Sequence, residues 1–232
     1  MIPKIIHYCW LSKDPIPEAL KTYMDTWKVK LPDYEFMLWN FDRFDINSSI
    51  WVKEAFEKKK YAFAADYIRL YSVYNYGGIY LDMDVEVLKT FNPFLNTSLL
   101  MGYEESGYLE MAVIGSIKKH PFIKAILNSY ERPFINKDGT LNARPMPLVV
   151  NDLCKKLNYK LAIGVKPNLL ESENINVFPS EFFSPKSWEL NKVNSTENTV
   201  CIHQFQGSWL SKSRKNTLKV KHFLKSVINF IK

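Results

Sequence analysis

The spacing of hydrophobic and polar positions predicts alternating strands and helices in the first third of the chain. Residues 4–10 form an apolar, β-prone run after a proline, which is typical of a buried strand. Apolar residues then recur at helical spacing from Pro17 to Trp27, and Pro17 suits a first helical turn. A further strand and two helices are expected at residues 34–39, 51–60 and 62–76. This order predicts an α/β domain with a largely parallel sheet.

The second half of the chain is less regular but carries the same kinds of element. Short strands are expected at residues 99–103, 112–117, 177–179 and 200–203, and helices at residues 121–130 and 147–157. Residues 132–146 are rich in Asn, Gly and Pro, and a loop of this length is often functional. No repeat or interdomain linker interrupts the pattern. We therefore expect one domain over residues 1–211, followed by a terminal segment at residues 212–232.

Three carboxylates follow the Gly-Gly pair that should end the helix at residues 62–76. If Asp82, Asp84 and Glu86 lie on one extended strand, they face the same side, while Met83 and Val85 face the core. Ligands bind at the carboxyl ends of strands in open α/β sheets, and carboxylate oxygens suit hard divalent cations. The alternative is a polar edge strand whose carboxylates are solvated. The Asp-x-Asp spacing alone does not separate these two interpretations.

A charged pair is expected on the helix that precedes this strand. Asp66 and Arg69 are three residues apart and therefore share one helix face. They could form an ordinary surface ion pair, which contributes little to stability. However, the helix otherwise consists mostly of aromatic and small residues, which indicates burial and favours contact with a ligand. A guanidinium suits a diphosphate, and a carboxylate suits sugar hydroxyls.

Composition places the chain among folded globular proteins. Hydrophobic residues make up 47% and aromatic residues 15% of the 232 residues, which is too many for a disordered chain. The three cysteines are far apart in the sequence, which fits free thiols in a reducing compartment. Neither a signal peptide nor an apolar run of about 18 residues is evident. We therefore expect a cytoplasmic protein, in solution or at the inner face of the cell membrane.

The net positive charge is concentrated at the C-terminus. The formal charge is +7, and residues 212–232 hold seven basic residues and no acidic one, so the other 24 basic residues balance the 24 acidic ones. A neutral body argues against binding to nucleic acid. Apolar residues recur at helical spacing among the terminal charges, and a basic amphipathic helix can dock on an anionic membrane surface. Packing of this helix on the domain is the alternative.

Five segments form a pattern that is more specific than the Asp-x-Asp spacing. They are residues 2–10 (IPKIIHYCW), 31–39 (LPDYEFMLW), 65–71 (ADYIRLY), 76–84 (YGGIYLDMD) and 203–209 (HQFQGSW). In this order they resemble glycosyltransferase family 32, whose signature is a DXD motif. They are also similar to bacterial capsular and exopolysaccharide glycosyltransferases and to the glucosyltransferase domain of the large clostridial toxins.

This resemblance implies a GT-A fold, a single domain with a Rossmann-like, mostly parallel sheet flanked by helices. It implies a retaining transfer of a hexose from a nucleotide-sugar donor, with UDP-galactose or UDP-glucose favoured over GDP-mannose. The acceptor would be a saccharide or a lipid-linked saccharide in surface polysaccharide biosynthesis. Mn²⁺, or Mg²⁺ in its place, would bind to Asp82, Asp84 and His203. Arg69 would act with the two aspartates on the departing diphosphate.

The resemblance also implies a donor-binding set and leaves the acceptor side open. The donor-binding residues would be Tyr8, Trp10, Asp66, Arg69, Tyr80, Asp82, Ser208 and Trp209. Where the family has a Gly-Pro pair followed by a small polar residue, this chain has Met146-Pro147-Leu148. The candidates for acceptor contacts are Glu104, Glu105 and Asn151. Retention through a protein carboxylate and retention through a same-face reaction both stay open.

Two other functions fit parts of the pattern. A magnesium-dependent phosphohydrolase of the haloacid-dehalogenase type also places Asp-x-Asp after an apolar strand. It prefers Thr or Val where this chain has Glu86, and it usually carries the motif at the start of the chain. The second alternative is a non-catalytic module that binds nucleotide-sugars or docks on a membrane. Mn²⁺-dependent hydrolysis of a nucleotide-sugar, lost on changing Asp84→Ala, would separate a transferase from both.

Overall fold

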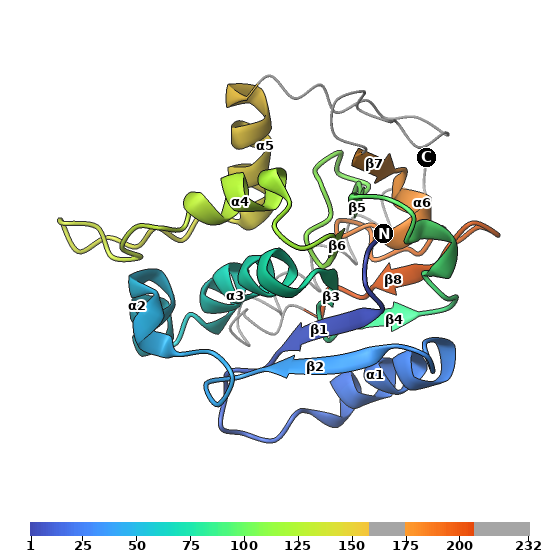
Figure 1. Cartoon of the computed structure of the whole chain (residues 1–232), viewed down its shortest axis with the longest axis horizontal. Coiled ribbons are helices and arrows are strands. Elements are labelled where there is room, and N and C mark those ends of the chain that lie inside the picture. The colour runs from blue at the N-terminus through green and yellow to red at the C-terminus, as the bar shows by residue number, and fades with distance from the viewer. Residues whose placement is uncertain (158–174, 207–232) are drawn as a thin grey trace, which may run out of the picture.

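The computed structural model describes residues 1–157 and 175–206 (Figure 1). Its centre is a six-stranded sheet with the strand order β2-β1-β3-β6-β5-β7. In the first half, β2 (Glu35–Trp39) and β3 (Gly78–Leu81) both pair in parallel with β1 (Ile5–Cys9). The basic segment at residues 212–232 lies outside the described residues, so its predicted helix stays a prediction.

The second half of the chain extends the same sheet. β6 (Val113–Ser116) runs antiparallel to both of its neighbours, β3 and β5 (Leu99–Gly102). β5 then pairs in parallel with β7 (Ile175–Phe178). The largely parallel sheet expected from the sequence is confirmed, because among these strands β6 alone runs in the opposite direction.

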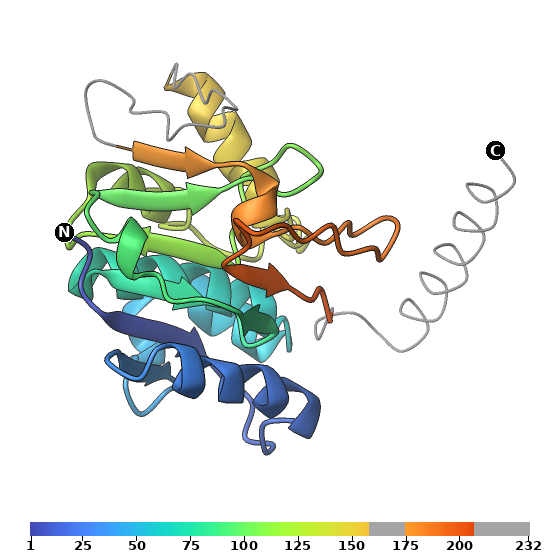
Figure 2. The same cartoon turned by 90° about the vertical axis from the view of Figure 1, so that its right-hand side faces the viewer.

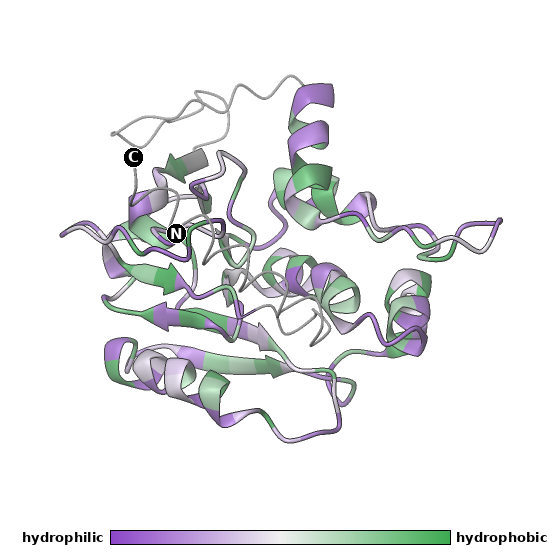
Figure 3. Ribbon diagram, turned by 180° about the vertical axis from the view of Figure 1, so that it is seen from behind, coloured by the Kyte–Doolittle hydropathy of each residue, from purple (hydrophilic) through white to green (hydrophobic). Residues whose placement is uncertain are grey.

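Helices cover both faces of the sheet (Figures 1 and 2). One hydrophobic cluster joins a face of the sheet to four helices, which are α2 (Ile50–Glu57), α3 (Tyr61–Tyr76), α4 (Pro121–Asn128) and α5 (Met146–Lys156). The other cluster joins the opposite face to α1 (Glu18–Lys30) and α6 (Ser180–Phe183). α5 changes from hydrophobic near α4 to hydrophilic at its far end (Figure 3). Among the described residues, no helix is both long and apolar enough to cross a membrane.

Side chains of β3 alternate between these two clusters. Ile79 and Leu81 pack in the cluster with α1, whereas Tyr80 packs in the cluster with α3. All three are 1% exposed or less. Successive side chains of a strand point to opposite faces, so this central strand has apolar residues on both sides. β3 ends at Leu81 in the buried sheet, and Asp82 is the next residue.

Two glycines end α3 and turn the chain into β3. Gly77 has φ 69° and Gly78 has φ 103°, a region that residues with a Cβ atom rarely adopt. A Cβ atom on Gly78 would also lie 2.6 Å from the carbonyl oxygen of Ile5. The close approach of β3 to β1 therefore requires glycine here. The helix stop predicted at Gly77-Gly78 is confirmed, whereas α1 begins at Glu18, one residue after the predicted Pro17.

The imidazole of His7, on β1, is neutral and lies buried against the turn formed by Gly77 and Gly78. Trp39 Nε1–H donates to His7 Nδ1 at 3.1 Å, so the proton of the ring must lie on Nε2. His7 Nε2 then donates to the carbonyl oxygen of Gly77 at 2.7 Å. Burial lowers the pKa of His7 to about 4, although the hydrogen bond to Gly77 opposes the shift. Protonation of Nδ1 would remove the acceptor that Trp39 needs.

Acidification is therefore expected to destabilise the fold through His7. Because the folded pKa lies below the unfolded value of 6.5, the unfolded chain takes up the proton more readily. The stabilisation present at pH 7 is lost as the pH falls from 6.5 through 4, by about 3 kcal/mol in total. Urea unfolding of the native protein and of His7→Gln between pH 7 and pH 4 checks this. The native free energy of unfolding should fall more steeply, and parallel curves would contradict the prediction.

A separate two-stranded sheet follows the carboxylates. β4 (Val85–Val87) pairs antiparallel with β8 (Cys201–His203), with Val85 opposite His203. The prediction of one continuous strand through Asp82, Asp84 and Glu86 is wrong, because residues 82–84 form a turn between β3 and β4. The apolar positions within this stretch are buried as predicted. The turn thus separates two strands that belong to different sheets.

Candidate active site

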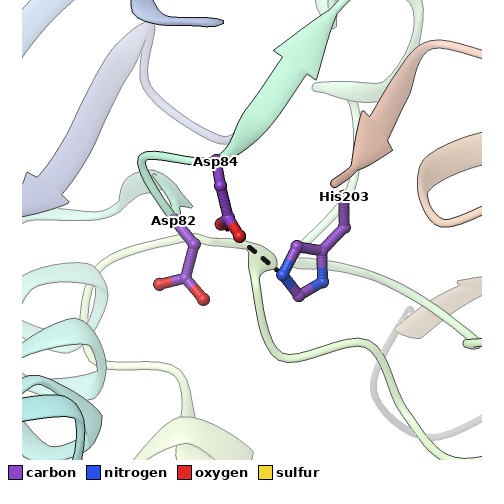
Figure 4. Close-up of side chains that lie close together, drawn as sticks. All are labelled: Asp82, Asp84 and His203. Carbon is purple, nitrogen blue, oxygen red and sulfur yellow. Dashed lines mark ion pairs between the residues drawn. The ribbon is translucent and has the colours of Figure 1, made fainter. Parts of the chain in front are cut away.

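The turn between β3 and β4 carries Asp82 and Asp84. The backbone N–H of Asp82 donates to the carbonyl oxygen of Ala112 at 2.9 Å, which anchors the turn to the main sheet. The N–H of Val85 closes the turn by donating to the carbonyl oxygen of Asp82 at 3.0 Å. Gln206 N–H donates to an Asp84 carboxylate oxygen at 2.8 Å. Both carboxylates point to one side of the turn (Figure 4).

His203 lies beside the two aspartates because β8 pairs with β4. Its Nε2 atom is 3.5 Å from Asp84 Oδ1 (Figure 4). One ligand atom from each of Asp82, Asp84 and His203 lies within 4.8 Å of the others. Carboxylate oxygens and an imidazole nitrogen form a donor set that divalent first-row metals accept. The residues therefore fit a divalent cation, and the structure brings together the metal trio that the sequence implied.

Arg69 on α3 connects the aspartates to the interior. Its Nη2 atom is 3.1 Å from Asp82 Oδ1 and 3.4 Å from Asp66 Oδ1. Its Nη1 atom donates to the carbonyl oxygen of Met111 at 2.5 Å. Arg69 and Asp66 are only 7% and 8% exposed, which excludes the surface ion pair considered as the alternative. Arg69 Nε is buried without a hydrogen-bond partner in the described part of the chain.

Tyr80 supports this arrangement from within the core. Its hydroxyl donates to Asp82 Oδ1 at 3.0 Å, and the Arg69 guanidinium lies 4.9 Å from the centre of its ring. Tyr80 is 1% exposed. Its position favours a role in orienting Asp82 and Arg69, and a direct donor contact stays a prediction.

The ionisation of the cluster follows from burial and neighbouring charge. Burial raises the pKa of Asp82, which the Arg69 guanidinium opposes. Burial also acts to raise the pKa of Asp84, but the charge and hydrogen bond of His203 hold it below its usual range. The pKa of His203 lies well above its usual range because Glu110 and Asp84 outweigh the effect of burial. The cluster thus concentrates negative charge that is balanced by His203 and Arg69.

A comparison with known protein families matches the part of the chain that carries the two aspartates and Arg69. Residues 17–100 match a family described as "Glycosyltransferase sugar-binding region containing DXD motif". This part of the chain is thus similar to the DXD-containing region of a glycosyltransferase family. This match confirms the resemblance seen in the sequence, and it includes Asp66, Arg69 and the Asp82-Met83-Asp84 turn.

Two curated relatives carry mannosyltransferase names. The chain is 32% identical over 139 residues to "Inositol phosphoceramide mannosyltransferase 3" of Schizosaccharomyces pombe, covering 56% of this chain and 38% of the relative. It is 28% identical over 207 residues to "Mannosyl phosphorylinositol ceramide synthase SUR1" of Saccharomyces cerevisiae, covering 82% of this chain and 52% of the relative. The chain thus spans about half the length of these relatives or less.

A solved glycosyltransferase structure shares the fold. "PaToxG Glycosyltransferase" superimposes with a TM-score of 0.50 and 19% sequence identity, covering 67% of this chain and 70% of the other. This likeness concerns the architecture alone. It confirms the GT-A type of fold expected from the sequence.

The two candidates for nucleobase contact, Tyr8 and Trp10, lie on or just after β1, at the edge of the sheet that also carries the DXD motif. Because β1 and β3 run parallel, Trp10 and the DXD motif both follow the carboxyl ends of their strands. Trp10 is half-buried, and its indole N–H donates to the carbonyl oxygen of Asp14 at 2.8 Å. Tyr8 packs edge-on against Trp27, with ring centres 5.7 Å apart. Their contact with a nucleobase stays a prediction.

The remaining predicted site residues differ in burial and in the contacts that they make. Glu104 is half-buried, and burial together with the charge of Glu110 raises its pKa to about 7. Glu105 is exposed. Asn151 lies on α5, and in the described part of the chain no hydrogen bond or ion pair joins it to the aspartates. Ser208 and Trp209 lie outside the described residues.

Three residues near the DXD motif, Glu110, Lys186 and Phe205, were not predicted from the sequence. Glu110 Oε2 is 3.1 Å from His203 Nδ1, and the Phe205 ring lies 3.9 Å from the His203 ring. Lys186 Nζ donates to Gln204 O at 2.9 Å and to Gln204 Oε1 at 3.0 Å. The sequence did carry one indication of Glu110, because it is the only charged residue in the apolar run at residues 108–112. Glu86 accepts from Gln204 Nε2 at 2.8 Å and is not part of the metal trio.

Proposed function

We propose that this chain is a hexosyltransferase that moves a sugar from a nucleotide-sugar donor to a saccharide or lipid-linked acceptor. The observation that carries the proposal is the convergence of Asp82, Asp84 and His203 beside the buried guanidinium of Arg69. A DXD region alone is compatible with binding. The buried guanidinium beside the predicted cation ligands supports catalysis, because positive charge there could stabilise a departing diphosphate. The surface polysaccharide context and the retention of configuration stay predictions.

The proposed role of each site residue follows from its charge. A divalent cation, when bound by Asp82, Asp84 and His203, supplies positive charge that stabilises the leaving diphosphate. Arg69 is held by Asp82 and by Met111 O, so its guanidinium needs little reorganisation when negative charge develops. Asp66 is suited to accept hydrogen bonds from hydroxyl groups of the donor sugar. Ser208 and Trp209 are proposed to cover the phosphates.

The proposed sugar depends on the relatives as well as on the motifs. The motif resemblance favours UDP-galactose or UDP-glucose. The names of the curated relatives instead contain mannose and an inositol phosphoceramide. These names support mannose as a second donor sugar and the head group of a lipid as an acceptor. A lipid acceptor would also suit docking of the basic segment at residues 212–232 on an anionic membrane at the inner face of the cell membrane.

A panel of donors tests the proposed function. Thermal unfolding is measured with UDP-glucose, UDP-galactose and GDP-mannose, each with and without Mn²⁺. A donor at one hundred times its Kd should stabilise the protein by about 2.7 kcal/mol, and the gain should require the cation. Release of nucleoside diphosphate upon addition of an acceptor then reports transfer. The Asp84→Asn variant is the matched control for both measurements.

The same panel separates the alternatives. A binding module would be stabilised by a donor but would show no metal-dependent release of nucleotide. A phosphohydrolase would release inorganic phosphate from phosphomonoesters. Stabilisation by no donor, together with no turnover that depends on Asp84, would contradict the transferase proposal.

A further inference from the structure

Glu110 is a buried carboxylate that the proposed reaction does not use directly. It is 2% exposed and lies between β5 and β6. Its Oε1 atom accepts the backbone N–H of Ala112 at 2.8 Å, and its own N–H donates to the carbonyl oxygen of Gly102 at 2.8 Å. Its Oε2 atom lies 3.1 Å from His203 Nδ1. Both carboxylate oxygens are therefore engaged, and the carboxylate is fixed relative to the sheet.

The His203 ring is held from several sides. The β4–β8 ladder fixes its backbone opposite Val85. The Phe205 ring covers it, with centres 3.9 Å apart and planes inclined by 36°. Glu110 meets Nδ1, and the opposite nitrogen, Nε2, faces Asp84 at 3.5 Å. The two ring nitrogens thus meet two different carboxylates.

The hydrogen bond to Glu110 determines which nitrogen can bind a cation. An ionised carboxylate only accepts hydrogen bonds, so Nδ1 must carry a proton in this contact. When a cation takes the place of the second proton, the imidazole keeps its N–H on Nδ1, and the lone pair on Nε2 can bind the cation. That nitrogen belongs to the trio formed with Asp82 and Asp84. Histidines that bind metals commonly donate their other N–H to a carboxylate, which fixes both tautomer and orientation.

We propose that Glu110 is a positioning residue that holds His203 in the Nδ1–H tautomer, with Nε2 directed at the cation bound by Asp82 and Asp84. This inference rests on the proposed function, because it assumes the cation at this trio. The competing explanation is a structural ion pair that ties β8 to the segment before β6. A structural pair would affect stability but would leave the cation affinity of the folded protein unchanged.

The first test measures Mn²⁺ affinity, with the electron paramagnetic resonance signal of free Mn²⁺ as the readout. Glu110→Gln should weaken binding roughly ten-fold, within the range typical of such supporting residues. Glu86→Gln is the matched control, because it removes one carboxylate charge near Asp84 without touching His203. Its affinity should stay within about two-fold of native. Equal losses in the two variants would overturn the proposal, since the effect would then be one of charge alone.

A double-mutant cycle separates positioning from structure. In a His203→Ala background, Glu110→Gln should change the Mn²⁺ affinity by less than about two-fold, because Glu110 acts through the missing ring. The same ten-fold loss in both backgrounds would overturn the proposal. Urea unfolding of each variant determines the folded fraction to which the affinities refer.

A second measurement needs no variant of Glu110. In the unmodified protein loaded with diamagnetic Zn²⁺, two-bond ¹H–¹⁵N correlations should show a proton on Nδ1 of His203 and none on Nε2. His203→Ala identifies the resonance. A proton on Nε2 would overturn the proposal.

Failure of this inference differs from failure of the proposed function. Asp84→Asn should abolish specific Mn²⁺ binding. If Mn²⁺ does not bind, or binds equally well to Asp84→Asn, both the cation site and the role of Glu110 are wrong. If binding depends on Asp84 but not on Glu110, only the role of Glu110 is wrong.

Discussion

Asp84→Asn is expected to lower kcat/KM for sugar transfer by roughly 100- to 1,000-fold, the cost of removing one strong electrostatic contact to a developing charge. Asn keeps an oxygen that can accept the N–H of Gln206, so the turn between β3 and β4 should persist. It loses the negative charge that a divalent cation requires. The rate of nucleotide release at increasing Mn²⁺ concentration measures the effect.

Glu86→Gln is the control for this prediction. It lies two residues further on, and a glutamine there can still accept from Gln204 Nε2. Its turnover should stay close to native, because Glu86 is outside the trio of Asp82, Asp84 and His203. Comparable losses in the two variants would mean that general negative charge, and not a cation ligand, explains the role of Asp84.

The carboxylate turn shows what the pattern of the sequence can and cannot predict. The alternation of apolar and acidic residues from Leu81 to Glu86 correctly predicted which side chains are buried. It did not predict the break between β3 and β4. Leu81 pairs with Val113, whereas Val85 pairs with His203, so the partner changes within four residues. Both strands share a period of two, and only the long-range partners distinguish them.

The elements around the turn were easier to predict than the contacts between them. Helix and strand positions follow from local periodicity, and the end of α3 follows from the conformational freedom of Gly77 and Gly78. The contact between His203 and Glu110 joins residues 93 positions apart, and local periodicity carries no information about it. The motif resemblance supplied His203 but not Glu110 or Lys186. Residues that support a site are thus harder to find from sequence than the residues that form it.

Arg69 shows how the stability of the fold and the chemistry of the site depend on the same residue. It is buried between Asp66 and Asp82, and Asp66 has no other ion-pair partner among the described residues. Burial raises the pKa of Asp66 to about 7, so this carboxyl depends on Arg69 to remain charged. A buried ion pair adds little net stability, but removal of one partner leaves an uncompensated charge. The guanidinium is therefore expected to stabilise the fold even before a ligand binds.

Arg69→Met is expected to lower the free energy of unfolding by roughly 3–5 kcal/mol, the usual cost of breaking a buried ion pair from one side. Urea unfolding at pH 7.5 measures the change. Arg144→Met is the matched control, because Arg144 pairs with Asp152 at 2.7 Å on the surface, where both side chains are about half exposed. It should cost less than about 1 kcal/mol. Equal losses in the free energy of unfolding for the two variants would contradict the prediction that an uncompensated buried charge destabilises the fold.

The double variant Asp66→Asn/Arg69→Met distinguishes uncompensated charge from lost packing. If stranded carboxylates cause the loss, neutralising Asp66 should restore part of the stability, so that the two changes together cost less than the sum of each alone. Strict additivity would assign the loss to packing against Tyr80 and to the hydrogen bond with Met111 O. Turnover should not recover in either case, because a restored fold still lacks the guanidinium that would face the departing diphosphate. Stability and activity would then respond to different properties of one side chain, its charge balance and its position beside Asp82.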